Sequence, residues 1–300
     1  MPAATPQRIL LTGGSGQLGY ECQLAAPQGV ELSVPDRAEL DLANPDSIRA
    51  CVAELRPDLI LHCGAWTAVD AAEAQEAEAL AVNEGGSRAL AEAARSLGAR
   101  LILVSTDYVF SGESSEPWPA DAPVQPINAY GRTKLAAERA VHEILGPRAQ
   151  IVRTSWVYGR RGQNFVRTML RLMQQGKPLR VVADQQGTPT WAGGLAAALW
   201  ALTQAPQAGP VLHYSDAGQT TWYEFAVAIR KLALGLGLDV ADSTVNPCQT
   251  DEYPTPANRP AWSVLELSCD WTTLGVPPHP WLETLSGALP LLIAEDKLTR

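Results

Sequence analysis

Short apolar runs alternate with alanine-rich stretches through the first half of this 300-residue chain. The runs typical of buried strands are residues 8–12, 30–34, 59–63, 100–105 and 150–154. Helices are predicted from residue 17 onwards and over residues 46–55, 69–97 and 130–145. Strands that alternate with helices at this spacing form parallel sheets with right-handed crossovers and helices on both faces. The sequence therefore predicts an α/β fold with a Rossmann-like, doubly wound parallel sheet.

The alternation becomes less regular after Thr154. The elements predicted there are helices over residues 164–175, 193–202 and 221–234 and one strand over residues 211–214. Residues 247–280 are rich in Pro and Trp and show little periodicity. We therefore predict a main domain of residues 1–155 with about 190–217, and a smaller C-terminal lobe of residues 156–189 with 218–300.

The charge and the cysteine content limit the partners and the compartment. A net charge of −9 argues against nucleic acid and anionic membranes as partners. No apolar run reaches membrane-spanning length, and the N-terminus lacks the basic and apolar regions of a signal peptide. The five cysteines, at positions 22, 51, 63, 248 and 269, include no C-x-x-C pair and are typical of reduced thiols. These features predict a cytoplasmic protein, and the scattered histidines predict no structural metal site.

A glycine-rich loop joins the first predicted strand to the first predicted helix. It reads Thr-Gly-Gly-Ser-Gly-Gln-Leu-Gly over residues 12–19. Gly13, Gly16 and Gly19 allow a tight turn, a close approach of the backbone to a pyrophosphate and close packing of the helix. The N-terminus of that helix directs free N–H groups at the phosphates. In its strand–turn–helix setting the loop predicts a dinucleotide cofactor.

The second predicted strand ends near the residues expected to recognise the adenosine ribose. Asp36 could accept a hydrogen bond from a ribose 2′-hydroxyl, which is typical of NAD sites, whereas Arg37 could bind a 2′-phosphate, which is typical of NADP sites. The two signals conflict. NADPH would be favoured if the chain catalyses a biosynthetic reduction, and NADH stays open.

A Tyr-x-x-x-Lys pair opens the helix predicted over residues 130–145. Tyr130 and Lys134 are four positions apart and therefore share one face of the helix. An ammonium group beside a phenol stabilises the phenolate, so we expect Lys134 to lower the pKa of Tyr130 and make it a usable acid. Thr106 ends the fourth predicted strand, and carboxyl ends of parallel strands face the ligand crevice. Alone, the pair would indicate an ordinary helix surface, but with Thr106 and the glycine loop it predicts a catalytic site.

These residues together resemble those of the extended short-chain dehydrogenases and reductases. Further motifs narrow the resemblance to the dTDP-4-dehydrorhamnose reductase family. They are residues 65–73 (AWTAVDAAE), 105–112 (STDYVFSG), 153–159 (RTSWVYG), 184–190 (DQQGTPT) and 259–265 (RPAWSVL). The resemblance runs from about residue 8 to residue 290.

The resemblance implies reduction of the C4 ketone of dTDP-4-dehydro-L-rhamnose to dTDP-L-rhamnose by NAD(P)H. Tyr130 would protonate the alkoxide, Lys134 would also bind the nicotinamide ribose, and Thr106 would orient the substrate oxygen. The main domain would bind the dinucleotide, and the smaller lobe would bind the nucleotide sugar. The expected cofactor contacts are Gly13, Ser15, Gly16, Gln17, Leu18, Gly19, Asp36, Arg37, Asp41, Leu42, Cys63, Gly64, Ala65, Thr67, Asn83, Ser105, Tyr130 and Lys134. The expected substrate contacts are Thr67, Val69, Thr106, Asp107, Val109, Phe110, Tyr130, Trp156, Asn164 and Arg259.

The resemblance also raises the question of a metal and a dimer. Some members of the family bind Mg²⁺ through glutamates at a homodimer interface. Glu21 resembles one of these glutamates, but Trp-Ala-Gly-Gly follows Pro189-Thr190 where another is expected. We therefore predict no bound metal and leave the homodimer open.

Several related functions compete with this hypothesis. A dehydratase would need an Asp-Glu pair after the Thr, whereas here Thr106-Asp107 is followed by Tyr108. A 4-epimerase fits the residues after Thr106 less well, and another dTDP-4-ketosugar reductase stays open because pocket walls set that choice. The regulatory subunit of methionine adenosyltransferase is a non-catalytic homologue, and the complete Thr106, Tyr130 and Lys134 set argues against that role. Trp191, Trp222 and Trp271 are interpreted as core residues.

Overall fold

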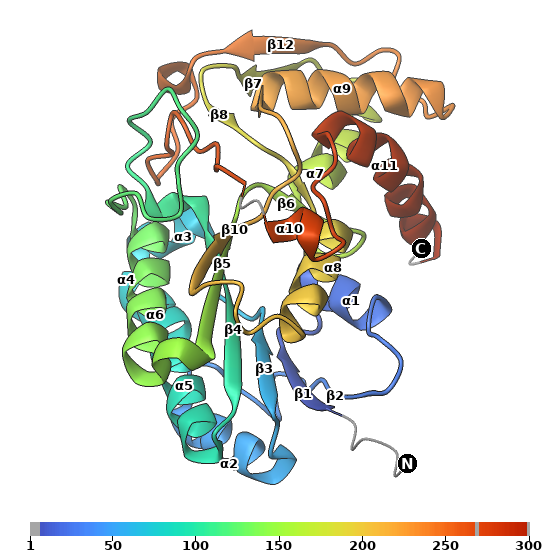
Figure 1. Ribbon diagram of the computed structural model, residues 1–300. Helices are drawn as coiled ribbons and strands as arrows, with labels where there is room; N and C mark the ends of the chain where they lie inside the picture. The colour runs from blue at the N-terminus through green and yellow to red at the C-terminus, as the bar shows by residue number, and fades with distance from the viewer. Residues whose placement is uncertain (1–6, 268–269, 299–300) are drawn as a thin grey trace.

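A six-stranded parallel sheet forms the centre of the computed structural model, which describes residues 7–267 and 270–298 (Figure 1). The strand order across the sheet is β2-β1-β3-β4-β5-β10. The strands are β1 (Gln7–Thr12), β2 (Val30–Ser33), β3 (Leu59–His62), β4 (Arg100–Thr106), β5 (Ala149–Thr154) and β10 (Val211–His213). All five neighbouring pairs are parallel, as the sequence predicts. The order reverses between β1 and β3, which is where doubly wound sheets bind their ligands.

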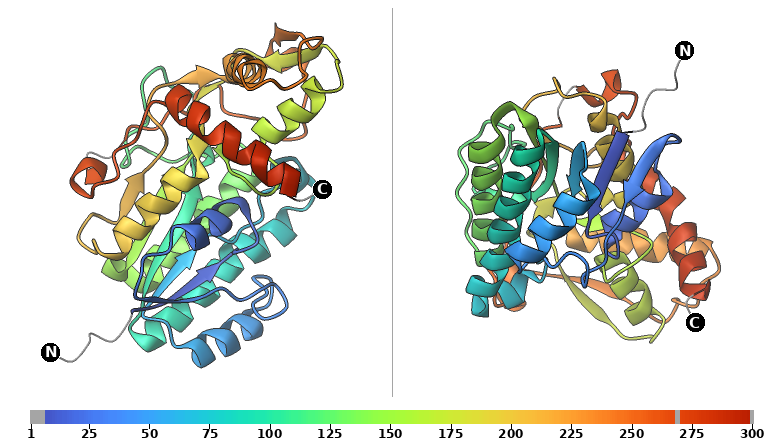
Figure 2. Two further views of the ribbon diagram at one scale, coloured as in Figure 1. Left: turned by 90° about the vertical axis from the view of Figure 1, so that its right-hand side faces the viewer. Right: turned by 90° about the horizontal axis from the view of Figure 1, so that it is seen from below.

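Helices cover both faces of the sheet (Figure 2). One face carries α1 (Gln17–Leu24), α8 (Ala192–Thr203) and the short α10 (Asp270–Thr273), which enclose a core with the sheet. The other face carries α2 (Pro45–Leu55), α5 (Gly86–Leu97) and α6 (Ala129–Leu145), which enclose a second core. The sheet is therefore buried on both sides, which is why its strands are apolar runs without alternation.

Helix starts follow local side-chain chemistry closely. Asn44 accepts hydrogen bonds from the backbone N–H groups of Asp46 and Ser47, and Pro45 occupies the first helical position of α2. Asn128 caps α6 by accepting from Gly131 N at 2.8 Å. This cap fixes where the helix begins and so places Tyr130 in its first turn.

The predicted helix over residues 69–97 is wrong as a single element. The structure has α3 (Val69–Ala74), a break at Gln75, α4 (Glu76–Leu80), a π-helical turn (Ala81–Gly85) and then α5. No Gly or Pro causes the break at Gln75. Instead the Glu73 carboxylate accepts a hydrogen bond from Ala129 N at 2.8 Å, which ties α3 to the start of α6. A tertiary contact overrides the helix propensity of this segment.

The remaining elements build a third core away from the sheet, seen at the top of Figure 1. Its helices are α7 (Phe165–Met173), α9 (Trp222–Gly235) and α11 (Trp281–Leu298). The short strand pairs are β7 (Leu179–Val182) with β12 (Val245–Cys248), β6 (Val157–Tyr158) with β9 (Thr190–Trp191), and β8 (Gln186–Gly187) with β11 (Thr220–Thr221). Neither α11, which contains Pro290, nor these short strands were predicted from the sequence.

The separate cores support the predicted division into a main domain and a smaller lobe, which stays a prediction. One residue departs from it. Trp271 lies within residues 218–300, yet it is fully buried in the core that α8 forms with the sheet. The Trp271 indole donates to His213 O at 2.7 Å, which attaches α10 to β10. Trp271 is a core residue, as predicted.

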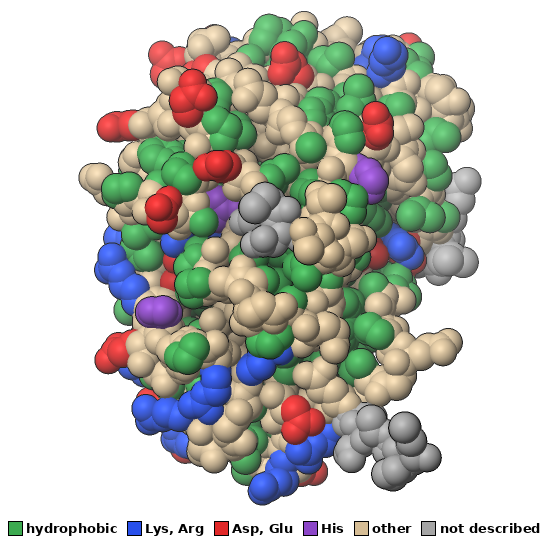
Figure 3. Space-filling view, viewed as in Figure 1, with side chains coloured by type: hydrophobic (Ala, Val, Ile, Leu, Met, Phe, Trp, Pro, Cys, Tyr) green, Lys and Arg blue, Asp and Glu red, His purple; other side chains and the backbone are tan. Residues whose placement is uncertain are grey.

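The surface and the helix lengths add two further observations. On the face shown in Figure 3, Lys and Arg side chains lie mainly towards the lower end and Asp and Glu mainly in the upper half. Within the described residues, no helix is both long and apolar enough to cross a bilayer. Cys22, Cys51, Cys63 and Cys248 are free thiols, and Cys269 lies outside the described residues.

Candidate active site

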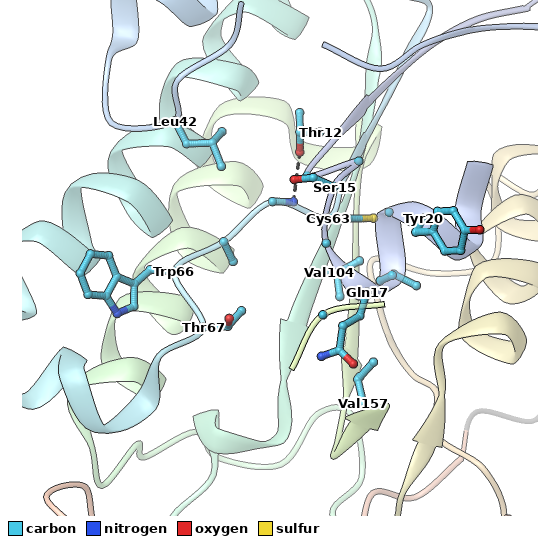
Figure 4. A pocket seen from close by; sticks show the side chains of 18 of the residues that line it. Thr12, Ser15, Gln17, Tyr20, Leu42, Cys63, Trp66, Thr67, Val104 and Val157 are labelled. Atoms are coloured by element: carbon cyan, nitrogen blue, oxygen red, sulfur yellow. Dashed lines mark hydrogen bonds between the residues drawn. The ribbon is translucent and has the colours of Figure 1, made fainter. Parts of the chain in front are cut away.

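A cavity of about 1110 Å³ opens over the carboxyl ends of the central strands. Its walls come from the glycine loop, from the segments after β2, β3 and β4, and from Tyr130 and Lys134 of α6. Figure 4 shows Leu42, Trp66 and Thr67 on one side of the cavity and Gln17 and Val157 on the other. This volume exceeds the ~300–1,000 Å³ typical of a pocket for one small ligand. The cavity therefore has room for two ligands end to end.

The glycine loop cannot accept side chains at two positions. Gly13 has φ +71°, and a Cβ there would lie 2.6 Å from Gly64. A Cβ on Gly19 would lie 2.1 Å from Gly13 O, which is backbone and cannot move aside. The first turn of α1 has no side-chain cap, so its N–H groups are free to bind an anion in the cavity. These observations fit a dinucleotide pyrophosphate at this end.

Asp36 and Arg37 differ in what their side chains already contact. The Asp36 carboxylate accepts from Ala38 N at 2.7 Å and from Glu39 N at 3.0 Å, which closes the turn after β2. The Arg37 side chain is 88% exposed and lies 4.0 Å from Asp41 Oδ1. Both residues line the cavity. Because the turn uses the Asp36 carboxylate, Arg37 has the greater freedom to contact a ligand.

Tyr130, Lys134 and Thr106 line the same cavity. Lys134 Nζ donates to Val104 O at 2.7 Å, which holds the ammonium group against β4. Thr106 Oγ1 donates to Asp107 Oδ1 at 2.9 Å and accepts from Tyr108 N at 3.2 Å. One helix and the end of one strand therefore present a phenol, an ammonium and a hydroxyl to the same space.

Burial dominates the electrostatics of this cluster. It lowers the pKa of Lys134 to about 8, against the opposing effects of Glu138 and Cys63. It raises the pKa of Asp107 to about 7. Burial, and then the neighbouring Asp107, also raise the pKa of Tyr130, while a hydrogen bond with Thr106 acts in the opposite direction. The predicted lowering of the Tyr130 pKa by Lys134 is therefore wrong: the pKa is raised, and Tyr130 is a neutral phenol that can donate a proton.

Trp156 and Trp222 form a stacked wall next to this cluster. Their ring centroids are 3.6 Å apart and their planes differ by 11°. Trp156 has φ +46°, a left-handed conformation that is strained for a bulky residue and typical of functional sites. A Cβ on Gly187 would lie 2.5 Å from the Trp156 ring, so the glycine makes room for it. Trp222 was predicted to be a core residue, but it lines the cavity with Trp156.

Most of the predicted site residues line this one cavity. They are Gly13, Ser15, Gly16, Gln17, Leu18, Gly19, Asp36, Arg37, Asp41, Leu42, Cys63, Gly64, Ala65, Thr67, Val69, Ser105, Thr106, Asp107, Tyr130, Lys134 and Trp156. The cavity is also lined by residues that were not predicted from the sequence, among them Tyr20, Gln23, Val82, Tyr108, Ser155, Arg161 and Gln163. Ser155 directly follows the end of β5, and Tyr108 lies two residues after the end of β4. This position near a strand end is a signal that could have identified them.

Val109 and Phe110 were expected to contact the sugar, and the structure places them elsewhere. Both side chains are fully buried in a small apolar cluster. Phe110 stacks on Trp118 with ring centroids 4.9 Å apart. The 3₁₀ turn over Asp107–Val109 rotates the chain away from the cavity, which the sequence does not reveal.

Asn164 and Arg259 also lie outside the cavity lining. Asn164 caps α7 by accepting from Arg167 N at 3.0 Å, and its amide donates to Gln17 Oε1 at 2.9 Å. Arg259 forms an ion pair with Asp70 at 2.9 Å. Both side chains are therefore used by contacts within the protein. Asn83, the remaining predicted contact, is buried and binds other protein groups.

The described residues contain no group of three or more His, Cys, Asp or Glu side chains that could hold a metal ion. Glu21, which resembles a metal-binding glutamate, is buried and lies 3.3 Å from Arg160 Nε. Burial raises the pKa of Glu21, and Arg160 opposes this effect. The absence of a bound metal stays a prediction.

A glycine loop after the first strand of a doubly wound sheet, with Tyr130 and Lys134 one helical turn apart at the same cavity, is the arrangement of short-chain dehydrogenases and reductases. The chain belongs to the RmlD substrate binding domain family, whose model matches residues 7–292. It is 42% identical over 291 residues to a Streptomyces griseus protein named dTDP-4-dehydrorhamnose reductase, covering 95% of this chain and 94% of that protein.

Two further relatives bear on the ligands. A Streptomyces niveus protein named dTDP-4-keto-6-deoxy-D-glucose reductase is 42% identical over 292 residues and covers 96% of this chain and 99% of its own. The solved structure of dTDP-4-dehydrorhamnose reductase from Bacillus anthracis, in complex with NADP, is 35% identical with a TM-score of 0.87. It covers 94% of this chain and 98% of its own.

Proposed function

We propose that this protein reduces the C4 ketone of dTDP-4-dehydro-L-rhamnose to dTDP-L-rhamnose with NADPH. The observation that carries the proposal is the grouping of Tyr130, Lys134 and Thr106 in a cavity that also contains the glycine loop. The S. griseus relative is named for this activity, and the B. anthracis structure contains NADP.

Different residues that line the cavity bind the cofactor, donate the proton and contact the sugar. The free N–H groups of the first turn of α1 bind the cofactor pyrophosphate, and Arg37 binds its 2′-phosphate. When bound, the reduced cofactor supplies the hydride. Tyr130 donates a proton to the C4 oxygen while Thr106 orients that oxygen. The Lys134 ammonium, held by Val104 O, stabilises the negative charge that develops on the phenol oxygen. Trp156 and Trp222 offer an apolar ring surface to the sugar.

Turnover of the sugar is the direct test of this proposal. The purified protein is incubated with NADPH and dTDP-4-dehydro-L-rhamnose, cofactor oxidation is followed by absorbance, and the product is identified by NMR. We expect oxidation coupled to formation of dTDP-L-rhamnose. No oxidation with NADPH or NADH would contradict the proposal, and a stable complex with a methionine adenosyltransferase would then support the regulatory alternative.

A second substrate follows from the S. niveus relative, which is named for a different 4-ketosugar. Pocket walls rather than the Tyr/Lys pair discriminate between sugar stereoisomers. The same assay with dTDP-4-keto-6-deoxy-D-glucose decides between the two. A higher kcat/KM for this sugar would replace the substrate in our proposal and leave the reaction type unchanged.

Replacing Arg37 with Gln tests the cofactor preference. We expect the KM for NADPH to rise by about tenfold, because a charge-assisted contact to a phosphate contributes roughly 1.5 kcal/mol or more. The KM for NADH should change by less than about twofold, since NADH lacks the phosphate. Steady-state kinetics with both cofactors measure this. An equal effect on both would show that Arg37 does not bind the 2′-phosphate.

The rate should also depend on the charge of Lys134. Because burial lowers its pKa to about 8, the ammonium is present below that pH and lost above it, so we expect kcat to fall as the pH rises through about 8. A Lys134→Arg variant keeps its charge in this range and should show a lower but flat rate. If the alkaline decline persists in this variant, a group other than Lys134 causes it.

A further inference from the structure

A buried hydrogen-bond chain begins beneath the glycine loop. Thr12, which ends β1, bonds through Oγ1 to His62 Nδ1 at 2.7 Å. The other ring nitrogen of His62 lies 3.0 Å from Ser87 Oγ in α5. Ser87 in turn donates to Asn83 O. Each of these four residues is at most 2% exposed.

The donor and acceptor of each hydrogen bond between Thr12 and Ser87 follow from the bond that Ser87 donates. The Ser87 hydroxyl donates to Asn83 O, so its oxygen accepts from His62 Nε2–H. Nδ1 of His62 therefore accepts from the Thr12 hydroxyl, whose oxygen accepts from Gly64 N at 3.2 Å. Figure 4 shows Thr12 next to the cavity. Burial and the charge of Lys134 lower the pKa of His62 to about 3, which keeps the ring neutral in this single tautomer.

The hydrogen-bond chain continues from Asn83 to α6, the helix that contains Tyr130 and Lys134. The Asn83 amide accepts from Trp66 N at 2.8 Å and donates to Thr133 Oγ1 at 2.9 Å. Thr133 Oγ1 donates to Tyr130 O at 2.8 Å. Asn83 lies in the π-helical turn between α4 and α5, an irregularity that is frequent at functional sites. A continuous path thus joins the strand end before the glycine loop to the backbone of Tyr130.

We propose that His62, Ser87, Asn83 and Thr133 are positioning residues that hold the cofactor-binding loop and Tyr130 in a fixed relative geometry. None of the four lines the cavity, so any effect on the reaction passes through other groups. The inference rests on the proposed function where kcat is measured. The dissociation constant for NADPH can be measured without the sugar substrate.

The alternative is that these residues only satisfy buried polar groups and stabilise the fold. Thr203 provides a matched control. It is buried in α8, and its hydroxyl donates to the carbonyl of Trp200, three residues earlier, as that of Thr133 does to Tyr130. Thr133→Val and Thr203→Val therefore remove equivalent local hydrogen bonds, but only Thr133 belongs to the hydrogen-bond chain between Thr12 and Tyr130.

The experiment measures the thermal midpoint, the dissociation constant for NADPH and kcat for His62→Gln, Thr133→Val, Thr133→Ser, Thr203→Val and the His62→Gln/Thr133→Val double variant. We expect Thr133→Val to lower kcat by about tenfold and raise the NADPH dissociation constant by about threefold, since small displacements in a site have effects of this size. Thr133→Ser retains the hydroxyl and should restore both. Thr203→Val should change neither.

The double variant tests whether the hydrogen-bond chain acts as one unit. Substitutions along a single hydrogen-bond path should be non-additive. We therefore expect kcat and the NADPH dissociation constant of the double variant to lie within about twofold of those of the more severe single variant. The inference fails if Thr133→Val lowers only the thermal midpoint, as Thr203→Val does, or if the two effects multiply. If the wild-type protein turns over no ketosugar, the proposed function fails, and the NADPH dissociation constants of the same variants still decide this inference.

Discussion

A Tyr130→Phe variant is expected to lose about 10²- to 10⁴-fold in kcat, because it lacks the proton that the proposed reaction places on the C4 oxygen. Tyr130 is held in the first turn of α6 by the Asn128 cap, and burial keeps its phenol protonated. Removing one hydroxyl leaves the ring in place, so the dissociation constant for NADPH should change by less than about threefold. Steady-state kinetics and fluorescence titration with NADPH measure the two quantities.

Tyr214→Phe is the matched control for this prediction. Burial raises the pKa of Tyr214 as it does that of Tyr130, but Tyr214 packs edge-on against Trp271 in the core and does not line the cavity. We expect the kcat of Tyr214→Phe to stay within about twofold of the wild-type value. If Tyr130→Phe kept more than about a tenth of the activity, the proton would come from another group. Asp107, whose pKa burial raises to about 7, would be the next candidate.

An Arg153→Met variant is expected to lose about 3–5 kcal/mol of unfolding free energy, because it leaves the Glu138 carboxylate buried without its cation. Arg153 donates to both oxygens of Glu138, at 3.0 and 2.8 Å, and the two side chains are only 6% and 5% exposed. Ser105 also donates to the same carboxylate. Chemical denaturation followed by circular dichroism measures the loss.

Arg132→Met removes an ion pair of similar geometry at the surface and serves as the comparison. Arg132 pairs with Glu76 at 2.7 Å, and both side chains are 44% exposed. Solvent screens such a pair, so the loss should not exceed about 1 kcal/mol. An Arg153→Met/Glu138→Leu double variant should regain part of the stability, since no unpaired charge remains. Equal losses for Arg153→Met and Arg132→Met would contradict the role assigned to burial.

The parts of the site that depend on local chemistry could be located from the sequence. The glycine loop and the Tyr130/Lys134 pair depend on turn geometry and helix periodicity, which act between residues close in the chain. The apolar runs predicted the strands because a sheet covered on both faces excludes polar residues. The central parallel sheet and the α6 helix were therefore predictable.

Features that depend on distant contacts could not be predicted in the same way. The break at Gln75 depends on the hydrogen bond between Glu73 and Ala129, more than fifty positions further along the chain. The direction of Val109 and Phe110 depends on a 3₁₀ turn and on Trp118, and the place of Trp222 depends on stacking with Trp156. The protonation of Tyr130 likewise depends on burial, which neither Lys134 nor helix spacing reveals.

The sequence by itself determined the class of fold, the position of the glycine loop and the Tyr130/Lys134 pair on one helix face. Each of these follows from residue types at short, fixed spacings. Only the tertiary structure decided which side chains face the cavity, which carboxylates and phenols hold their protons, and how His62 and Asn83 connect the glycine loop to Tyr130. Burial and long-range hydrogen bonds control these properties, and both arise only when segments far apart in the chain pack together.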